Sequence, residues 1–215
     1  MPKIPGFISY SSADRGIAAD VKNALLACGV DAFMAHEDIH VSQQWRDRIV
    51  DELRRMEVFV PLLSANFRTS EWTAQEAGAA IVRRDVLIIP ASLDGTIPYG
   101  FLNHFQGRRL HRPVDPAFFR VPLLAHKPGA IIDALIDDLE GAGSFRGAES
   151  RMQPIVPLFN QLSPAQAERI VDIAISNNQI WDASKCRATY LPDLLRSAAG
   201  KVPAAKVQEL QDRIA

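Results

Sequence analysis

The chain has 215 residues, of which 47% are hydrophobic and 23% charged, so it can bury a substantial core. Its 24 basic and 25 acidic residues nearly balance and form no long run of one sign, which argues against nucleic acid as the main partner. No apolar run reaches the length of a membrane span, no signal-peptide pattern opens the chain, and Cys28 and Cys186 match no zinc or redox spacing. We therefore expect a cytoplasmic protein with reduced thiols and no membrane or nucleic-acid partner.

Short apolar runs alternate with amphipathic stretches over the first two-thirds of the chain. Helices are indicated by apolar residues at a spacing of three or four, and the first of them is expected to stop at Gly29. The expected strands lie within residues 5–12, 30–35, 58–64 and 85–93. The expected helices begin at residue 14, run through residues 45–56, and cover residues 70–83 and 129–141.

This alternation of apolar strands and helices predicts a parallel α/β sheet that is wrapped by helices. In such a sheet the ligand crevice lies beyond the carboxyl ends of the strands. The rule brings together four loops, at residues 9–15, 35–44, 64–72 and 92–101. Glu76 follows the third of these loops by about one helical turn, so its position makes it a candidate functional residue.

The last third of the chain has a different texture. Residues 142–153 are mostly small and polar without periodicity, and we interpret them as a linker. Beyond them, Ser163 and Pro164 open a helix, and two shorter helices are expected within residues 190–200 and 203–215. We therefore divide the chain into a domain at 1–141, a linker at 142–153 and a small helical appendage at 154–215.

Several motifs in order resemble those of the TIR (Toll/interleukin-1 receptor) domain family. They are FISYSSADRGIAADVKNAL, GVDAFMAHEDI followed by a tryptophan, FVPLLSANFRTSEWTAQE, IIPASLD and PYGF. The resemblance covers about residues 5 to 140 and is nearer to the bacterial, enzymatic branch than to the receptor adaptors. It implies a flavodoxin-like fold with a central five-stranded parallel sheet, to which this chain adds an all-α C-terminal region.

The resemblance also implies an activity. Enzymatic TIR domains cleave the bond between nicotinamide and ribose in NAD, which is a substrate and not a cofactor, and release nicotinamide with ADP-ribose or a cyclic ADP-ribose messenger. Their catalytic glutamate lies four residues after an aromatic residue, a pattern that Trp72 and Glu76 fit. Residues 35–44 match the loop that packs against a neighbouring TIR domain. The implied setting is bacterial anti-phage immunity, with assembly into a homo-oligomer and an effector or sensor protein as a possible further partner.

A carboxylate suits this chemistry because positive charge grows on the ribose as the neutral nicotinamide leaves. We expect the helix N-terminus to lower the pKa of Glu76 and keep it ionised. Without the resemblance, the ordinary interpretation of Glu76 is a solvated helix residue, and that of Trp72 is a packing or pocket-wall residue. Ser64 and Ser70 are interpreted as helix caps because no His–Asp pair accompanies them.

Further substrate-binding candidates line the expected crevice. Tyr10, Ser11 and Ser12 supply donors for a phosphate or ribose, and Phe33 or Trp72 has a ring that can stack on the dinucleotide. Asp38 lies in the loop at 35–44, where it is placed to touch ligand or the adjacent protomer. We predict no metal, since His36 and His40 lie four apart in a segment without a helical pattern.

Three other functions make different demands on the sequence. A non-enzymatic TIR–TIR interaction module or scaffold in signalling is the main alternative, with the loop at 35–44 and the helical tail as its contact surfaces. A flavodoxin-like phosphoacceptor would need an acidic cluster after the first strand, where only Asp14 is close. A dinucleotide dehydrogenase or an ATPase would need a glycine-rich phosphate loop, which the sequence lacks.

Overall fold

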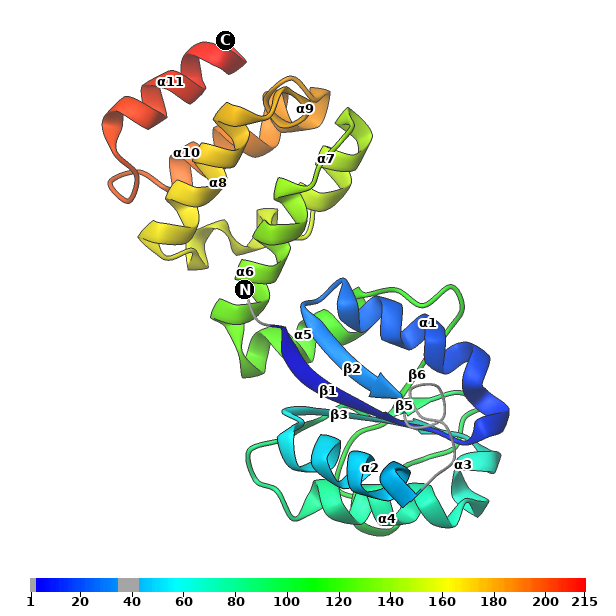
Figure 1. The fold of residues 1–215 in the computed structure, drawn as a ribbon. Coiled ribbons are helices and arrows are strands. Elements are labelled where there is room, and N and C mark those ends of the chain that lie inside the picture. Colours follow the sequence, from blue (N-terminus) through cyan, green and yellow to red (C-terminus); the bar gives the residue numbers. More distant parts are fainter. Residues whose placement is uncertain (1–2, 35–42) are drawn as a thin grey trace. The chain divides into compact units, whose positions relative to one another are not determined.

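A computed structural model describes residues 3–34 and 43–215 of the chain, with the side chains of residues 43–45 left out. Its internal contacts divide the chain into two compact units, residues 2–128 and 129–215 (Figure 1). The first unit holds a parallel sheet between helices. In chain order its elements are β1 (Ile4–Ser9), η1 (Ser12–Asp14), α1 (Arg15–Leu26), β2 (Val30–Met34), α2 (Gln43–Arg55), β3 (Val58–Leu63), α3 (Ala65–Thr69), α4 (Glu71–Ile81), β4 (Leu87–Ile88), β5 (Ala91–Ser92), η2 (Gly100–Leu102), β6 (Arg108–Arg109) and α5 (Ala117–His126).

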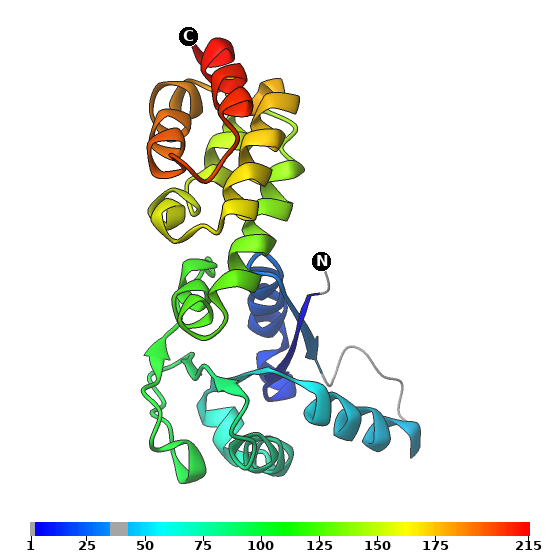
Figure 2. The ribbon, with the colours of Figure 1, turned by 90° about the vertical axis from the view of Figure 1, so that its left-hand side faces the viewer.

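The sheet has the strand order of flavodoxin-like folds. All neighbouring strands are parallel, in the order β2-β1-β3-β5-β6, and β4 pairs with β3 just before β5 does. β4 and β5 together occupy the position of one strand, which Ile89 and Pro90 interrupt. Helices α2 and α4 cover one face of the sheet, and α1 and α5 cover the other (Figure 2). The predicted α/β fold with its parallel sheet is confirmed.

A row of three phenylalanines forms the centre of the face that α2 and α4 cover. Phe33, Phe7 and Phe59 are direct neighbours on β2, β1 and β3, and the ring of Phe7 lies 5.5 Å from that of Phe33 and 6.0 Å from that of Phe59. Since side chains alternate along a strand, Ser9 shares this face with Phe7 and lies one step nearer the carboxyl edge. On this face the hydroxyl group of Ser9 therefore lies between the apolar row and the edge of the sheet where the crevice was predicted.

The expected strands and helices of this unit are present. α1 ends where predicted, because Gly29 adopts a φ of 80° that other residues adopt only at a cost. Ile49 on α2 and Met56, which comes directly after α2, are both buried in the core, and Leu53 is partly buried. The helices α3 and α5 and the two-residue strand β6 were not predicted. α3 and β6 have too few residues to show a period, and α5 contains Pro122, a residue that disfavours a helix interior.

The second unit is entirely helical. Arg169 on α8 pairs with Asp137 and Glu140 of α6 at 2.6 and 2.8 Å. Lys206 on α11 pairs with Glu168 and Asp172 of α8. The elements are α6 (Pro128–Glu140), α7 (Phe145–Met152), η3 (Val156–Gln161), α8 (Pro164–Ser176), α9 (Asn178–Trp181), the π-helical η4 (Cys186–Tyr190), α10 (Leu191–Ser197) and α11 (Ala204–Ile214).

The segment expected to be an irregular linker, residues 142–153, is largely helix α7. Ser144 caps this helix by accepting a hydrogen bond from the backbone of Gly147, and Ala148 and Met152 bury one face of it. A helix of eight residues with only a few apolar positions shows no clear period, so its tertiary burial is not readable from the sequence. The start predicted for α8, with Ser163 as its cap, is confirmed. The structure adds a capping box, in which Ser163 and Gln166 each accept a hydrogen bond from the other's backbone N–H.

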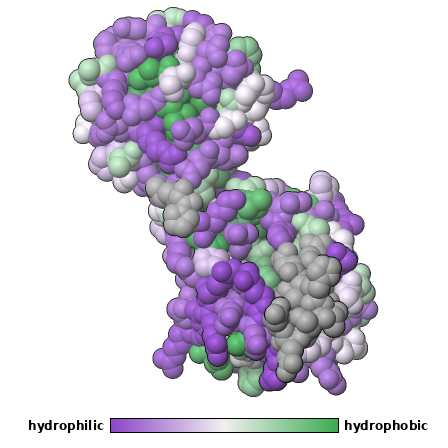
Figure 3. All heavy atoms as spheres, in the orientation of Figure 1, coloured by the Kyte–Doolittle hydropathy of each residue, from purple (hydrophilic) through white to green (hydrophobic). Residues whose placement is uncertain are grey.

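No helix in the described part of the chain is long and apolar enough to cross a membrane. Polar residues cover most of the face of each unit that is drawn in Figure 3, and hydrophobic residues appear there only in small areas.

Candidate functional site

Glu76 lies on the face of α4 that packs against the sheet, and only 4% of its surface is exposed. It meets Ser9, the last residue of β1, whose hydroxyl donates a hydrogen bond of 2.5 Å to Oε2 of Glu76. Ser9 is itself fully buried. The structure thus places a carboxyl group inside the protein at the carboxyl end of β1.

Burial raises the pKa of Glu76 to about 7, and the hydrogen bond from Ser9 lowers it by a smaller amount. This corrects the expectation that the helix N-terminus keeps Glu76 fully ionised. α4 begins at Glu71, so Glu76 lies beyond the first turn, where the effect of the helix dipole has largely faded. Removal from water therefore dominates, and the carboxyl group exchanges its proton near neutral pH.

Trp72 and Glu76 lie in different surroundings although they are one turn apart on α4. Trp72 is 43% exposed, whereas Glu76 is buried against β1. Trp72 is therefore not a core residue. Trp72 is the second residue of α4 and so lies at the start of the helix, next to the third crevice loop. Its role as a pocket wall or as a ring that stacks on NAD stays a prediction.

Phe33 is 7% exposed and is enclosed on two sides, by the ring of Phe7 and by the guanidinium of Arg48, which lies 5.9 Å from the centre of its ring. This enclosure favours the packing role for Phe33 over stacking on a ligand. The phenol of Tyr10 is also buried, at 1% exposure, so it is not a group on an open loop.

Ser11 and Ser12 follow β1, with Ser11 partly exposed and Ser12 exposed at the start of η1. They remain available to a ligand at the predicted crevice. Asp38, His36 and His40, together with residues 35–42 of the predicted contact loop, lie outside the described residues. Among residues 3–34 and 43–215, no group of three His, Cys, Asp or Glu is placed to hold a metal ion.

Hydrogen bonds tie together the loops after β1, β3 and β5. Ser64 donates to Asp14 at 2.6 Å and also caps α3, as predicted, by accepting from the backbone of Phe67. Asp94 accepts from the backbone N–H of Ala65 at 2.9 Å and bonds to Thr96, whose hydroxyl is the main cause of the lowering of the Asp94 pKa to about 2. These contacts hold the crevice loops in a fixed arrangement around the end of the sheet.

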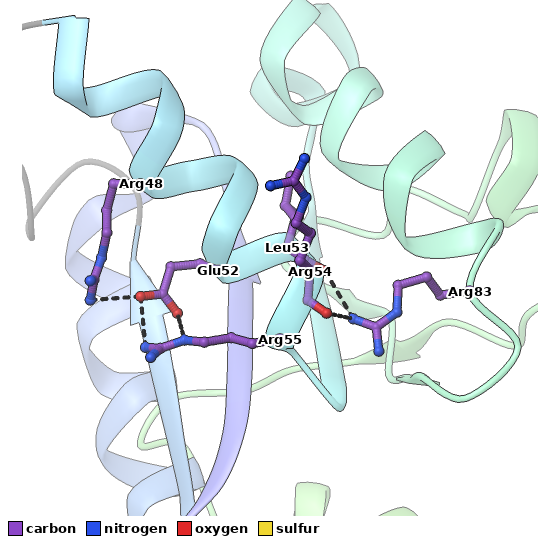
Figure 4. A network of polar contacts seen from close by, with 6 residues as sticks. All are labelled: Arg48, Glu52, Leu53, Arg54, Arg55 and Arg83. Atoms are coloured by element: carbon purple, nitrogen blue, oxygen red, sulfur yellow. Dashed lines mark hydrogen bonds and ion pairs between the residues drawn. The ribbon is translucent and has the colours of Figure 1, made fainter.

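A second buried glutamate, Glu52, lies on α2 and is compensated differently. Its carboxylate pairs with Arg48 at 2.7 Å and with Arg55 on the other side (Figure 4). Arg83, from the end of α4, donates to the backbone carbonyls of Leu53 and Arg54 and so links α4 to the last turn of α2. Both carboxylate oxygens of Glu52 and both of these carbonyls accept hydrogen bonds, and the contacts hold the two helices in place.

Residues 7–120 match the model of the TIR domain family, and this range includes both Ser9 and Glu76. The chain belongs to the TIR domain family. The match ends before α6, so residues 121–215 lie outside the TIR family model, and the predicted end of the domain at residue 141 stays a prediction. Comparison with curated proteins and with solved structures gives no match.

Ser9 is the residue of the TIR unit's site that reasoning from the sequence missed. One signal was present: the sheet alternation places Ser9 on the same face as Phe7, and that face is covered by the helix carrying Glu76. Only the packing of α4 on β1 turns this shared face into a contact, and the contacting residues are 67 positions apart in the chain.

Proposed function

We propose that this TIR protein cleaves the bond between nicotinamide and ribose in NAD, with Glu76 as the catalytic residue. The TIR family includes NAD-cleaving enzymes. The observation that carries the proposal for this chain is the burial of Glu76 at the carboxyl edge of the sheet, with a serine hydroxyl and no described cation beside it. A carboxyl group buried without a charge partner costs stability, and such groups concentrate at functional sites.

The reaction follows from the charges. The bond from ribose C1′ to the pyridinium nitrogen breaks with its electron pair going to nitrogen, and nicotinamide leaves as a neutral molecule. The ribose then carries a positive charge shared between C1′ and its ring oxygen. The Glu76 carboxylate stabilises that charge more strongly in a site that excludes water than it would in solution.

Two products are compatible with this first step. Water adds to C1′ and loses a proton to give ADP-ribose, or an adenine nitrogen adds instead and gives cyclic ADP-ribose and a proton. Ser11, Ser12 and Tyr10 after β1, Trp72 on α4, Phe33 on β2 and Asp38 are the predicted contacts to NAD. Glu76, Phe33 and Tyr10 are all buried, so each would reach NAD only if its side chain becomes exposed.

The test is an incubation of NAD with the concentrated full chain, followed by chromatography of the products. Wild type is expected to release nicotinamide with one of the two ADP-ribose products, and Glu76→Gln to release at least about a hundredfold less. Ser64→Ala is the matched control, because it removes a buried serine hydroxyl from the next strand's end without touching Glu76. Equal nicotinamide release by wild type and Glu76→Gln would refute the proposed role of Glu76.

The proposed setting is cytoplasmic defence of a bacterium against phage, with activity switched on by assembly into a homo-oligomer or by an effector or sensor protein. Cys28 and Cys186 are both free, buried thiols, as suits a reducing compartment. If neighbouring copies complete the site, the rate per protomer rises with protein concentration. A rate per protomer that stays constant over a wide concentration range would count against assembly.

A second candidate function is the non-enzymatic interaction module. It is favoured by large apolar side chains that the TIR unit leaves exposed, notably Trp72, Ile97 and Phe101, of which the last two are 74% and 71% exposed. Such side chains are common at protein contacts but also occur singly on ordinary surfaces. A Glu76→Gln protein that retains full biological activity would favour this function over NAD cleavage.

A further inference from the structure

The contact between Ser9 and Glu76 joins the two halves of the proposed site. It is a tertiary contact, made between the end of β1 and the second turn of α4. Ser9 is fully buried and Glu76 nearly so. Because both groups are shielded from solvent, bulk water cannot replace the hydroxyl if it is removed, and the carboxylate would lose a partner outright.

The hydroxyl has two physical effects on the carboxyl group. A donor at 2.5 Å from Oε2 fixes the rotation of the carboxyl group, and so decides which oxygen is turned away from β1. A hydrogen bond donated to a carboxylate also favours its charged form, which opposes the effect of burial. Both effects act on the group that must carry a negative charge when NAD is cleaved.

The other charged groups on the described elements around α4 are engaged with other partners or exposed to solvent. β1, β3 and η2, which pack against α4, contain no titratable side chain. On α3, Arg68 lies over the ring of Tyr99. On α2, Glu52 pairs with Arg48 and Arg55, and the exposed Asp51 pairs with Arg54. The other charged side chains of α2 that the structure describes, Arg46 and Asp47, are exposed. On α4 itself, the charged residue besides Glu76 is the exposed Glu71.

We propose that Ser9 is a positioning residue for this reaction: its hydroxyl holds the Glu76 carboxyl group in the reactive orientation and favours its charged form. This inference rests on the proposed function of Glu76. Ser9 acts through Glu76 and forms no bond to substrate in this role. It differs from Ser64, which is also buried, comes directly after β3 and donates to a different carboxylate, that of Asp14.

The experiment compares the pH dependence of NAD cleavage by wild type, Ser9→Ala, Ser9→Thr and Ser64→Ala at equal concentration of the full chain. In Ser9→Ala the midpoint of the rise in rate is expected to move to higher pH by about one unit, since one hydrogen bond to the charged form is lost. Ser9→Thr, which keeps a hydroxyl, and Ser64→Ala keep the wild-type midpoint. Lower rates with an unchanged midpoint in Ser9→Ala would overturn the proposal, because they indicate only a structural role.

A second measurement does not depend on turnover. The carboxyl carbon of Glu76 is titrated by NMR in wild type, Ser9→Ala and Ser9→Cys, the last being a weak donor of similar size that covers the case in which the alanine variant fails to fold. An upward shift of the Glu76 midpoint in either variant supports the contact, and an unchanged midpoint overturns it. If wild type never cleaves NAD although this shift is seen, the proposed function fails while the contact between Ser9 and Glu76 stands.

Discussion

Helices α2 and α4 pack on the same face of the sheet, and each buries one glutamate. Glu52 on α2 is 2% exposed and is neutralised by two guanidinium groups, while Glu76 on α4 is 4% exposed and receives a hydroxyl from Ser9. Burial alone therefore does not distinguish a structural carboxylate from a functional one. The distinguishing feature is the partner, since a charge buried beside a neutral donor costs stability that a packing role would not require.

Replacing Glu76 is expected to give the largest change and to affect activity and stability in opposite directions. Glu76→Gln is expected to abolish most of the proposed NAD cleavage. It also removes a carboxyl group whose pKa is about 7 in the folded protein against an ordinary value of 4.5. Such a group does not lower the free energy of unfolding below pH 4.5. From there to pH 7 its destabilising effect grows with pH, because the unfolded chain releases the proton first. Above pH 7 the cost reaches about 3 kcal/mol, which is the pKa difference converted to free energy.

Urea unfolding at pH 8 and at pH 4 checks this prediction. Glu76→Gln should raise the unfolding midpoint at pH 8 and leave it nearly unchanged at pH 4. Ser64→Ala again serves as control, since the loss of a helix cap should lower stability by about 1 kcal/mol at both pH values. If Glu76→Gln destabilised the protein at pH 8, Glu76 would have to be a structural residue like Glu52.

The rate of wild-type NAD cleavage is expected to rise about tenfold between pH 6 and pH 8. The reason is that a carboxyl group with a pKa of about 7 changes over this range from mostly protonated to mostly ionised. Initial rates at NAD concentrations well below KM measure the change, because they report kcat/KM and so the ionisation of the free protein. A rate that is flat from pH 5 to pH 9 would mean that Glu76 titrates at its ordinary value, and the contrast with Glu52 would then lose its physical basis.

Glu52→Gln is expected to lower stability and to leave activity nearly unchanged, the reverse of the effect of Glu76→Gln. The change leaves Arg48 and Arg55 without a carboxylate and should lower the free energy of unfolding by about 1 kcal/mol, since both arginines are more than half exposed and recover water. NAD cleavage should stay within about twofold of wild type, because the fold of α4 is retained. Unfolding and rate measurements on the same preparation separate the two effects, and a selective loss of activity without loss of stability would assign Glu52 to the site.

The comparison also explains how far the sequence could lead. The strands, the main helices, the sheet type and Glu76 follow from periodicity and from the order of the motifs, because these are local signals. The pKa of Glu76 and the role of Ser9 do not, since both depend on how α4 packs against β1 across 67 residues. For the same reason the sequence does not show that Glu52 is as deeply buried as Glu76: each is a glutamate in an amphipathic helix, and the arginines beside Glu52 look like ordinary surface charges.

Arg55→Gln is expected to have the smallest effect and tests whether the Glu52 cluster needs both of its cations. Arg55 is 58% exposed and Glu52 keeps Arg48, so the free energy of unfolding should fall by about 0.5 kcal/mol and the loss should shrink in high salt. Arg54→Gln is the matched control at the preceding residue, whose pair with Asp51 lies at the surface. If Arg55→Gln lowered the free energy of unfolding as much as Glu52→Gln does, one cation would not suffice to stabilise this buried carboxylate. The burial of Glu76 beside a single hydroxyl would then be still harder to explain by a packing role alone.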